Sequence, residues 1–166
     1  MKRIISILLL TAALVSMLAG CGLALPAPEI KNGEFDVTVT YEVNGEVKTL
    51  DLTYVCKYKG VQYTLEGNAY RAWEGHFAGY NDGDVIDVID TEDGGKVYLC
   101  FHIYAEYFMG EPDYIDDFDP SVAVERLYYD ENGDEMIDYD QDEIAENYGV
   151  RVIGIEYDEP IQNTFK

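Results

Sequence analysis

The sequence predicts a mainly β protein, an antiparallel β-sandwich of about eight or nine short strands with one short helix. Three observations predict this fold. Apolar and polar residues alternate with period two from residue 35 onward, turn signals rich in Asn, Asp and Gly separate the alternating runs, and the apolar residues of one hairpin are in register across its turn. Many short strands without an internal repeat are typical of a sandwich or a barrel. We favour the sandwich, with an immunoglobulin-like topology as one possibility.

The first hairpin is the clearest element of the sequence. Apolar residues alternate with polar ones from Phe35 to Val43, and Asn44-Gly45 follows. This dipeptide favours a type I′ turn, because both of its residues tolerate a positive φ. A two-residue turn and the apolar pattern predict the same register, in three pairs: Phe35 with Tyr54, Val37 with Leu52 and Val39 with Leu50.

The remaining elements follow from the same alternation. After the return strand at 50–58, we expect strands at 61–65, 70–77, 85–89, 97–107, 122–129, 135–139 and 150–157. Turn signals lie at Asn81-Asp82-Gly83, Asp93-Gly94-Gly95 and Asn132-Gly133. One short helix is predicted after residue 140, where Asp140 can cap it, Glu143 lies three residues further on and Gly149 can end it.

The first twenty-one residues indicate a bacterial lipoprotein signal. Lys2 and Arg3 precede an apolar run of about 14 residues, which is shorter than the roughly 20 residues that span a bilayer. Leu18-Ala19-Gly20-Cys21 then matches the lipobox that lipoprotein signal peptidase cleaves before the cysteine. We therefore expect residues 1–20 to be a signal peptide, 21–34 to be a lipidated Cys21 with a short tether, and 35–166 to be one domain. An ordinary secretory signal or a transmembrane helix is the alternative.

The chain as a whole resembles the small, uncharacterised lipoproteins of Gram-positive bacteria. The resemblance rests on the segment from Leu18 to Cys21 together with a domain rich in Tyr and acidic residues. It implies a protein on the extracytoplasmic face of the cell membrane, held there by palmitate or other acyl chains on Cys21. It implies no activity.

The chain is strongly acidic, with a formal net charge of −22, which becomes −24 once Lys2 and Arg3 leave with the signal. Such a surface repels nucleic acid and anionic lipid and favours cations or basic partners, although solubility alone also explains it. The segment from Glu111 to Glu146 holds 15 acidic residues and one basic residue, Arg126.

Two cysteines remain if Cys21 carries lipid. Cys56 and Cys100 both fall in predicted strands, and export permits a disulfide between them, with two buried thiols as the alternative. Cys100 and His102 are two residues apart, so they share a strand face, and with Cys56 opposite they could form a thiol–imidazole pair or a metal site. No CxxC or HxxxH spacing supports that site.

Calcium is the cation that the acidic segment suggests. Asp130, Asn132 and Asp134 form D-x-N-x-D, the opening of a calcium loop, but Glu135 stands where that loop needs Gly and Gln141 where it needs Glu. An ordinary hairpin turn explains the same residues. A second acidic group is also a candidate, although a run of charges is usually solvated; its members are Asp113, Asp116, Asp117 and Asp119.

Aromatic residues offer a candidate ligand surface around the chain's one tryptophan. Rings at Tyr70, Trp73 and Tyr80 could stack on a sugar or a partner protein if they are exposed, whereas Trp73 would otherwise pack in the core. For catalysis the sequence offers little, because Ser121 is the one serine after residue 20 and no G-x-S-x-G, P-loop or HExxH motif occurs.

These observations predict a membrane-anchored extracytoplasmic lipoprotein that binds an extracellular protein or glycan and is not an enzyme. A cell-envelope hydrolase using a pair of carboxylates is the alternative. Clustered acids in a deep pocket would favour that alternative, whereas a sandwich without a cleft would count against it.

Overall fold

The computed structural model describes residues 25–80, 85–115 and 118–166. The predicted signal peptide, Cys21 and the turn signal at Asn81-Asp82-Gly83 lie outside the described residues, as do Asp116 and Asp117. No helix in the described part of the chain is long and apolar enough to cross a membrane.

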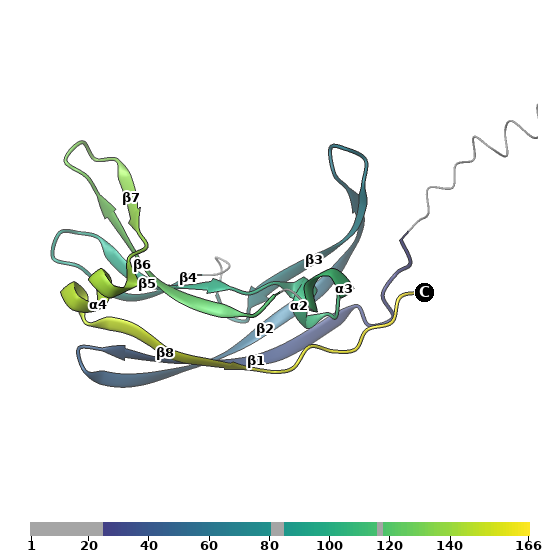
Figure 1. The fold of residues 1–166 in the computed structure, drawn as a ribbon, viewed down its shortest axis with the longest axis horizontal. Coiled ribbons are helices and arrows are strands. Elements are labelled where there is room, and N and C mark those ends of the chain that lie inside the picture. Colours follow the sequence, from purple (N-terminus) through teal and green to yellow (C-terminus); the bar gives the residue numbers. More distant parts are fainter. Residues whose placement is uncertain (1–24, 81–84, 116–117) are drawn as a thin grey trace, which may run out of the picture.

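Two four-stranded antiparallel sheets pack face to face, which confirms the predicted β-sandwich (Figure 1). The first sheet has the order β3-β2-β1-β8 and the second the order β4-β5-β6-β7. The first sheet contains β1 (Asn32–Val43), β2 (Glu46–Tyr63), β3 (Ala69–Phe77) and β8 (Val150–Tyr157). The second contains β4 (Val85–Asp90), β5 (Lys96–His102), β6 (Ser121–Tyr129) and β7 (Glu135–Asp138). The described helices are α2 (Ala105–Phe108), α3 (Pro112–Ile115) and α4 (Gln141–Tyr148).

The connections between the strands are simpler than those of an immunoglobulin domain. An immunoglobulin sandwich places its strands A, B, E and D in one sheet and C, F and G in the other. Here the first three strands form a meander, the next four form a second meander, and β8 returns to pair with β1. The immunoglobulin-like topology considered from the sequence is therefore corrected.

The first hairpin has the register that its sequence predicts. Phe35 pairs with Tyr54, Val37 with Leu52 and Val39 with Leu50. The turn residues Asn44 and Gly45 have φ angles of 53° and 82°, as a type I′ turn requires. The predicted helix is also confirmed, because the Asp140 carboxylate caps the start of α4 and Gly149 ends it with a φ of 66°.

Three boundaries differ from those expected. The chain predicted to form strands at 50–58 and 61–65 is one strand, β2, which continues past Gly60 through an irregularity in its pairing with β3. Strand β1 begins at Asn32, so residues 32–34 belong to the sheet and not to the expected tether. The strand expected at 97–107 ends at His102, and α2 follows it because Phe108 and Met109 are adjacent and both fully buried, which the alternating faces of a strand do not allow.

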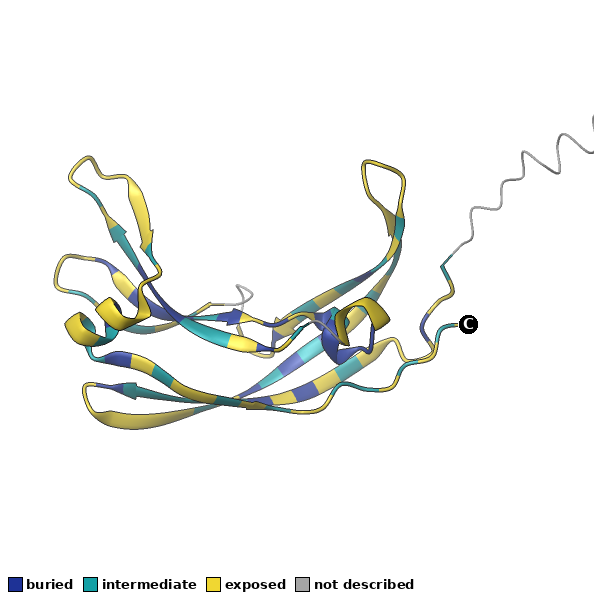
Figure 2. Ribbon diagram, viewed as in Figure 1, coloured by how far each residue is buried: buried dark blue, intermediate teal, exposed yellow. Residues whose placement is uncertain are grey.

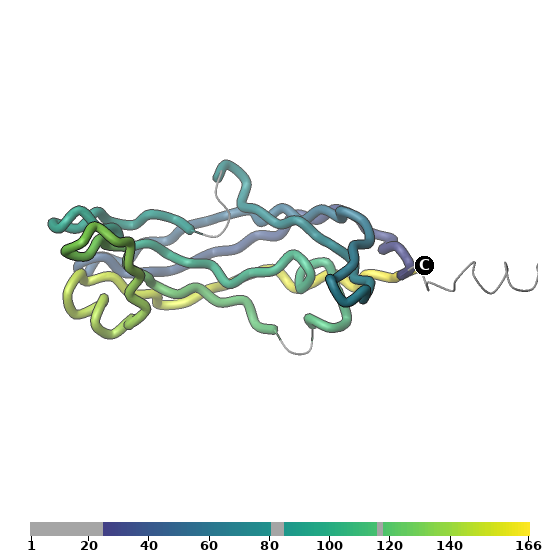
Figure 3. Tube along the Cα trace, turned by 90° about the horizontal axis from the view of Figure 1, so that it is seen from above, coloured from purple at the N-terminus to yellow at the C-terminus, as the bar shows by residue number. Residues whose placement is uncertain are grey.

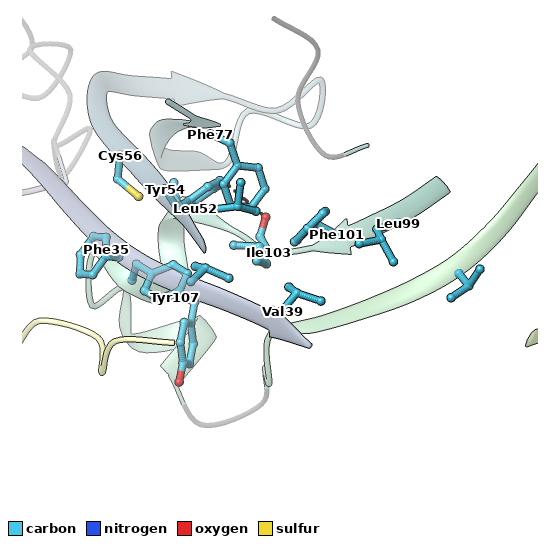
Figure 4. Packing of buried hydrophobic residues seen from close by; sticks show 14 of the residues in the cluster. Phe35, Val39, Leu52, Tyr54, Cys56, Phe77, Leu99, Phe101, Ile103 and Tyr107 are labelled. Carbon is cyan, nitrogen blue, oxygen red and sulfur yellow. Dashed lines mark hydrogen bonds between the residues drawn. The ribbon is translucent and has the colours of Figure 1, made fainter. Parts of the chain in front are cut away.

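The core lies between the sheets, and most outward faces are exposed (Figure 2). Alternate residues of β1, β2 and β5 point into it, and α2 fills the space between the sheets near the end where the described chain begins (Figures 1 and 4). Ile144 of α4 and Val150 of β8 join it from the opposite end. Phe35, Tyr54, Phe77, Phe101 and Phe108 supply the rings at its centre.

The two ends of the sandwich are different. Residues 25–31 and 158–166 run side by side at one end, which we call the terminal end (Figure 1). Pro28 bridges to Phe165, the Glu29 amide donates to the Thr164 carbonyl, and Asn163 hydrogen-bonds the Ile30 backbone in both directions. The turns at 44–45, 91–95 and 130–134 lie together with α4 at the opposite end, which we call the acidic end (Figures 1 and 3).

Candidate functional site

Trp73 lies on the inner face of β3 and is partly buried. Its ring packs against Tyr58, with 5.1 Å between the ring centroids, and its indole N–H donates to Oε1 of Glu111 at 2.9 Å. Tyr70 is three residues away on the same strand and so points to the opposite face, where its hydroxyl donates to Gln62. Tyr80 lies beyond the end of β3. The structure therefore does not bring the three predicted ligand-binding rings onto one surface, and Trp73 packs against the core.

The Glu111 carboxylate is the centre of a buried polar network at the terminal end. Arg71 donates from Nε to Oε1 at 2.6 Å and from its second terminal nitrogen to Oε2 at 2.7 Å, and both side chains are about one-tenth exposed. The hydrogen bonds that Arg71 donates to Glu111 raise the pKa of Arg71 above its usual value. The guanidinium also lies 4.0 Å above the Phe165 ring, so the network holds the C-terminal tail.

A pocket of about 370 Å³ opens beside this network. Tyr70, Arg71, Glu106, Glu111 and Tyr114 are among its lining residues. Burial raises the pKa of Glu106, and the Glu111 charge raises it further. Of the three carboxyl groups that line the pocket, those of Glu106, Glu111 and Asp113, the Glu111 carboxylate has both oxygens occupied by Arg71 and Trp73.

The predicted calcium turn is a hydrogen-bonded hairpin turn between β6 and β7. Oδ1 of Asp130 accepts from the amides of Asn132 and Asp134, both at 2.8 Å, and Oδ2 accepts from the Asn132 side chain. These hydrogen bonds, that from the Asp134 amide most of all, lower the pKa of Asp130. The turn explains these residues without an ion, and calcium binding stays a prediction.

The second acidic group is only partly described. Asp113 lines the pocket beside Arg71, whereas Asp119 accepts a hydrogen bond from the hydroxyl of Tyr157 on β8. These two residues have different partners.

No disulfide joins Cys56 to Cys100 in the structure. Cys56 points from β2 into the core and is fully buried, and burial raises the pKa of its thiol to about 12. Cys100 lies between Leu99 and Phe101, which both point into the core, so its side chain is on the outer face of the second sheet. The predicted disulfide does not form here, because one side chain points inward and the other points away from the space between the sheets.

Cys100 instead belongs to a cluster on that outer face. Its sulfur, a ring nitrogen of His102 and a carboxylate oxygen of Glu125 all lie within 4.8 Å of one another. Oε2 of Glu125 also accepts a hydrogen bond of 3.0 Å from the hydroxyl of Tyr98. The pairing of Cys100 with His102 is as the sequence predicts, but Glu125 takes the place expected for Cys56.

Comparison of the chain with protein-family models, with curated proteins and with solved structures found no match.

Sequence reasoning missed Glu111, Glu125 and Tyr98 as site residues. The contact between Arg71 and Glu111 spans 40 positions, and no local pattern predicts such a pair. Glu125 carried a weak signal, since it is an acidic residue directly after the apolar run Val122-Ala123-Val124. Its position beside Cys100 depends on the register of β5 with β6, which the intervening residues 103–120 do not reveal.

Proposed function

We propose that this chain is a lipid-anchored extracytoplasmic lipoprotein that binds an extracellular partner with a basic surface, protein or glycan, and is not an enzyme. The observation that supports this most directly is the separation of the two ends of the sandwich. The described chain begins at the terminal end, and the acidic turns lie at the other (Figure 1).

The anchor position sets the orientation of the sandwich. Leu25 is four residues after Cys21, which is at most roughly 14 Å of extended chain. Residues 25–31 are then held against the C-terminal tail by backbone hydrogen bonds, such as that from the Lys166 amide to the Ala27 carbonyl at 3.0 Å. A lipidated Cys21 would therefore keep the terminal end next to the membrane and point the acidic end away from it.

The acidic end is suited to a cationic partner rather than to the membrane or to nucleic acid. Exposed carboxylates repel anionic headgroups and phosphates and attract basic surfaces over about a Debye length, which is roughly 8 Å at physiological salt. Its carboxylates come from three segments: Asp90, Glu92 and Asp93; Asp130, Glu131, Asp134 and Glu135; Asp138, Asp140, Asp142, Glu143 and Glu146.

Replacing Cys21 with alanine should release the protein from the membrane. Without the thiol no acyl chain can be attached, and each buried CH₂ of such a chain contributes about 0.8 kcal/mol to anchoring. Labelling with a radioactive fatty acid should mark the wild-type chain and not Cys21→Ala, and fractionation should move the variant out of the membrane pellet. Cys100→Ala is the matched control and should keep both label and location. A Cys21→Ala chain that remains acylated and membrane-bound would contradict the anchor.

The partner surface can be tested with decalysine as a cationic probe. Removing three charges from the turn at the acidic end (Glu131→Gln, Asp134→Asn, Glu135→Gln) should weaken binding about fivefold, since each exposed ion pair contributes roughly 0.3 kcal/mol. The matched control removes three exposed charges elsewhere (Glu34→Gln, Glu66→Gln, Glu159→Gln) and should change the Kd less than twofold. Equal losses in the two triple variants, measured by calorimetry, would show that net charge rather than the acidic end attracts the probe.

A carboxylate-pair hydrolase remains the second candidate, and one observation favours it. Glu106 lines a pocket, and burial raises its pKa, which is the direction of shift expected for a general acid. The neighbouring Glu111 is poorly suited to act as its partner, because Arg71 and Trp73 already use both of its oxygens. Turnover of an envelope glycan that Glu106→Gln abolishes would favour the hydrolase over the binding module.

A further inference from the structure

Three side chains of different chemistry converge on the outer face of the second sheet. Cys100 and His102 are alternate residues of β5, so both point outward, and Glu125 stands on the adjacent strand β6 opposite Tyr98. The residue opposite Cys100 is Ala123, whose small side chain leaves room for longer neighbours to approach above it. The register of β5 with β6 therefore brings the three side chains together.

The spacing of the three donor atoms is close to that around a metal ion. Zinc bonds of about 2.0–2.3 Å to nitrogen, oxygen and sulfur place tetrahedral ligands roughly 3.3–3.6 Å apart. The donor atoms of Cys100, His102 and Glu125 lie within 4.8 Å of one another. Small side-chain rotations on a fixed backbone can close this difference.

The donor set selects among metals. A thiolate and an imidazole favour zinc and the neighbouring divalent transition metals, whereas calcium and magnesium prefer oxygen ligands alone. Three protein ligands leave one position of a tetrahedral ion for water or for an outside ligand, which is the arrangement of an open site.

Tyr98 fixes one of the three ligands. Its hydroxyl donates to Oε2 of Glu125 at 3.0 Å in a buried environment. This hydrogen bond holds the Glu125 carboxylate in one orientation on the sheet. Hydrogen bonds of this kind orient metal ligands and raise affinity.

The exposure of the ligands leaves a route for the ion. Glu125 is 8% exposed, Cys100 is partly buried and His102 is exposed. The cluster is therefore supported from beneath by the sheet and can be reached through His102.

We propose that Cys100, His102 and Glu125 bind a divalent transition-metal ion of the zinc class, with the fourth position left to water or to a ligand from outside. This proposal does not depend on the lipid anchor or on the cationic partner. The metal site can therefore be disproved without affecting the proposed function, and the reverse also holds.

The test is metal titration of the full chain carrying Cys21→Ser, with thiols reduced and without a histidine tag. Zn²⁺ binding is followed by calorimetry, and Co²⁺ binding by the absorption of its thiolate charge-transfer band. We expect one equivalent to bind at pH 7.5, with affinity falling as the pH is lowered, because protons compete for the thiolate and the imidazole.

Four variants test the site, two at ligands and two at neighbouring residues. His102→Ala and Cys100→Ser should each weaken Zn²⁺ binding more than tenfold, and Cys100→Ser should abolish the cobalt charge-transfer band. Tyr98→Phe keeps all three ligands and should weaken binding about tenfold through the loss of orientation. Ala123→Leu should block the site without removing a ligand.

The matched control is His76→Ala, which removes an exposed histidine of the other sheet and should leave the Kd within twofold. His102 is exposed, so His102→Ala is expected to fold even if a change at the buried Glu125 does not. Wild-type and His102→Ala chains that bind Zn²⁺ equally would overturn the proposal, as would the absence of a charge-transfer band with stoichiometric Co²⁺. An equal loss in His76→Ala would assign the ion to dispersed surface groups instead.

Discussion

Replacing Glu111 with alanine should lower the free energy of unfolding by about 3–5 kcal/mol, the cost of leaving a buried charge without its partner. The Arg71 guanidinium would lose both of its hydrogen bonds to the carboxylate, and the Trp73 N–H would lose its acceptor. Urea denaturation followed by Trp73 fluorescence measures the change directly, because the reporter lies in the network.

An exposed ion pair between β2 and β3 provides the matched control. Lys59 and Glu74 also form a salt bridge, but both side chains are about half exposed, so Glu74→Ala should cost at most about 1 kcal/mol. The double variant Arg71→Met, Glu111→Leu removes both charges together and should recover most of the stability lost in Glu111→Ala. Similar losses of unfolding free energy in Glu111→Ala and Glu74→Ala would show that burial does not make the Arg71–Glu111 pair more important for stability than an exposed pair.

Replacing Phe108 with alanine should be about as damaging, with an expected loss of about 3–5 kcal/mol from the lost transfer free energy and the cavity left behind. Phe108 is fully buried, and its ring contacts Phe35, Tyr54 and Tyr157 at centroid distances of 4.7, 5.7 and 6.1 Å. It thus connects α2 to three strands of the first sheet, and its removal should loosen the terminal end.

Leu65→Ala is the control for Phe108→Ala. Leu65 lies fully exposed between β2 and β3, so its truncation should change stability by no more than about 0.5 kcal/mol. Thermal and urea unfolding of both variants should show the difference. A loss below 1 kcal/mol in Phe108→Ala would mean that the core at this end is not packed as described.

Local sequence signals predicted most of the secondary structure. The alternation and turn chemistry around Asn44-Gly45 determined the register of the first hairpin, because both act within about ten residues. The cap at Asp140 likewise predicted α4. Helix α2 was missed because the alternation of Phe101, Ile103, Ala105 and Tyr107 continues the pattern of β5, although the run Tyr107-Phe108-Met109 shows that the pattern has ended.

The candidate sites were less predictable, for a physical reason. Cys100 and His102 are close in sequence, and their shared face follows from strand periodicity. Glu125 and Tyr98 join them because β5 pairs with β6. These two strands are separated by 18 residues, and no tight turn between them determines their register. Whether Cys56 and Cys100 face the core depends on which alternate residues of their strands point inward. The sequence did not predict which residues of β5 point inward.

The position of β1 has a mechanical consequence for an anchored protein. The first strand after the proposed anchor is β1, a central strand that is hydrogen-bonded to β2 along Asn32–Val43 and to β8 along Val37–Val43. A pull between the membrane and a partner at the acidic end would act along β1, across hydrogen bonds that run perpendicular to the strand. The hydrogen bonds between β1 and β2 and those between β1 and β8 would then share the load in shear. They would not open one at a time. In such a protein the tether would be joined to the part of the sandwich that resists extension best.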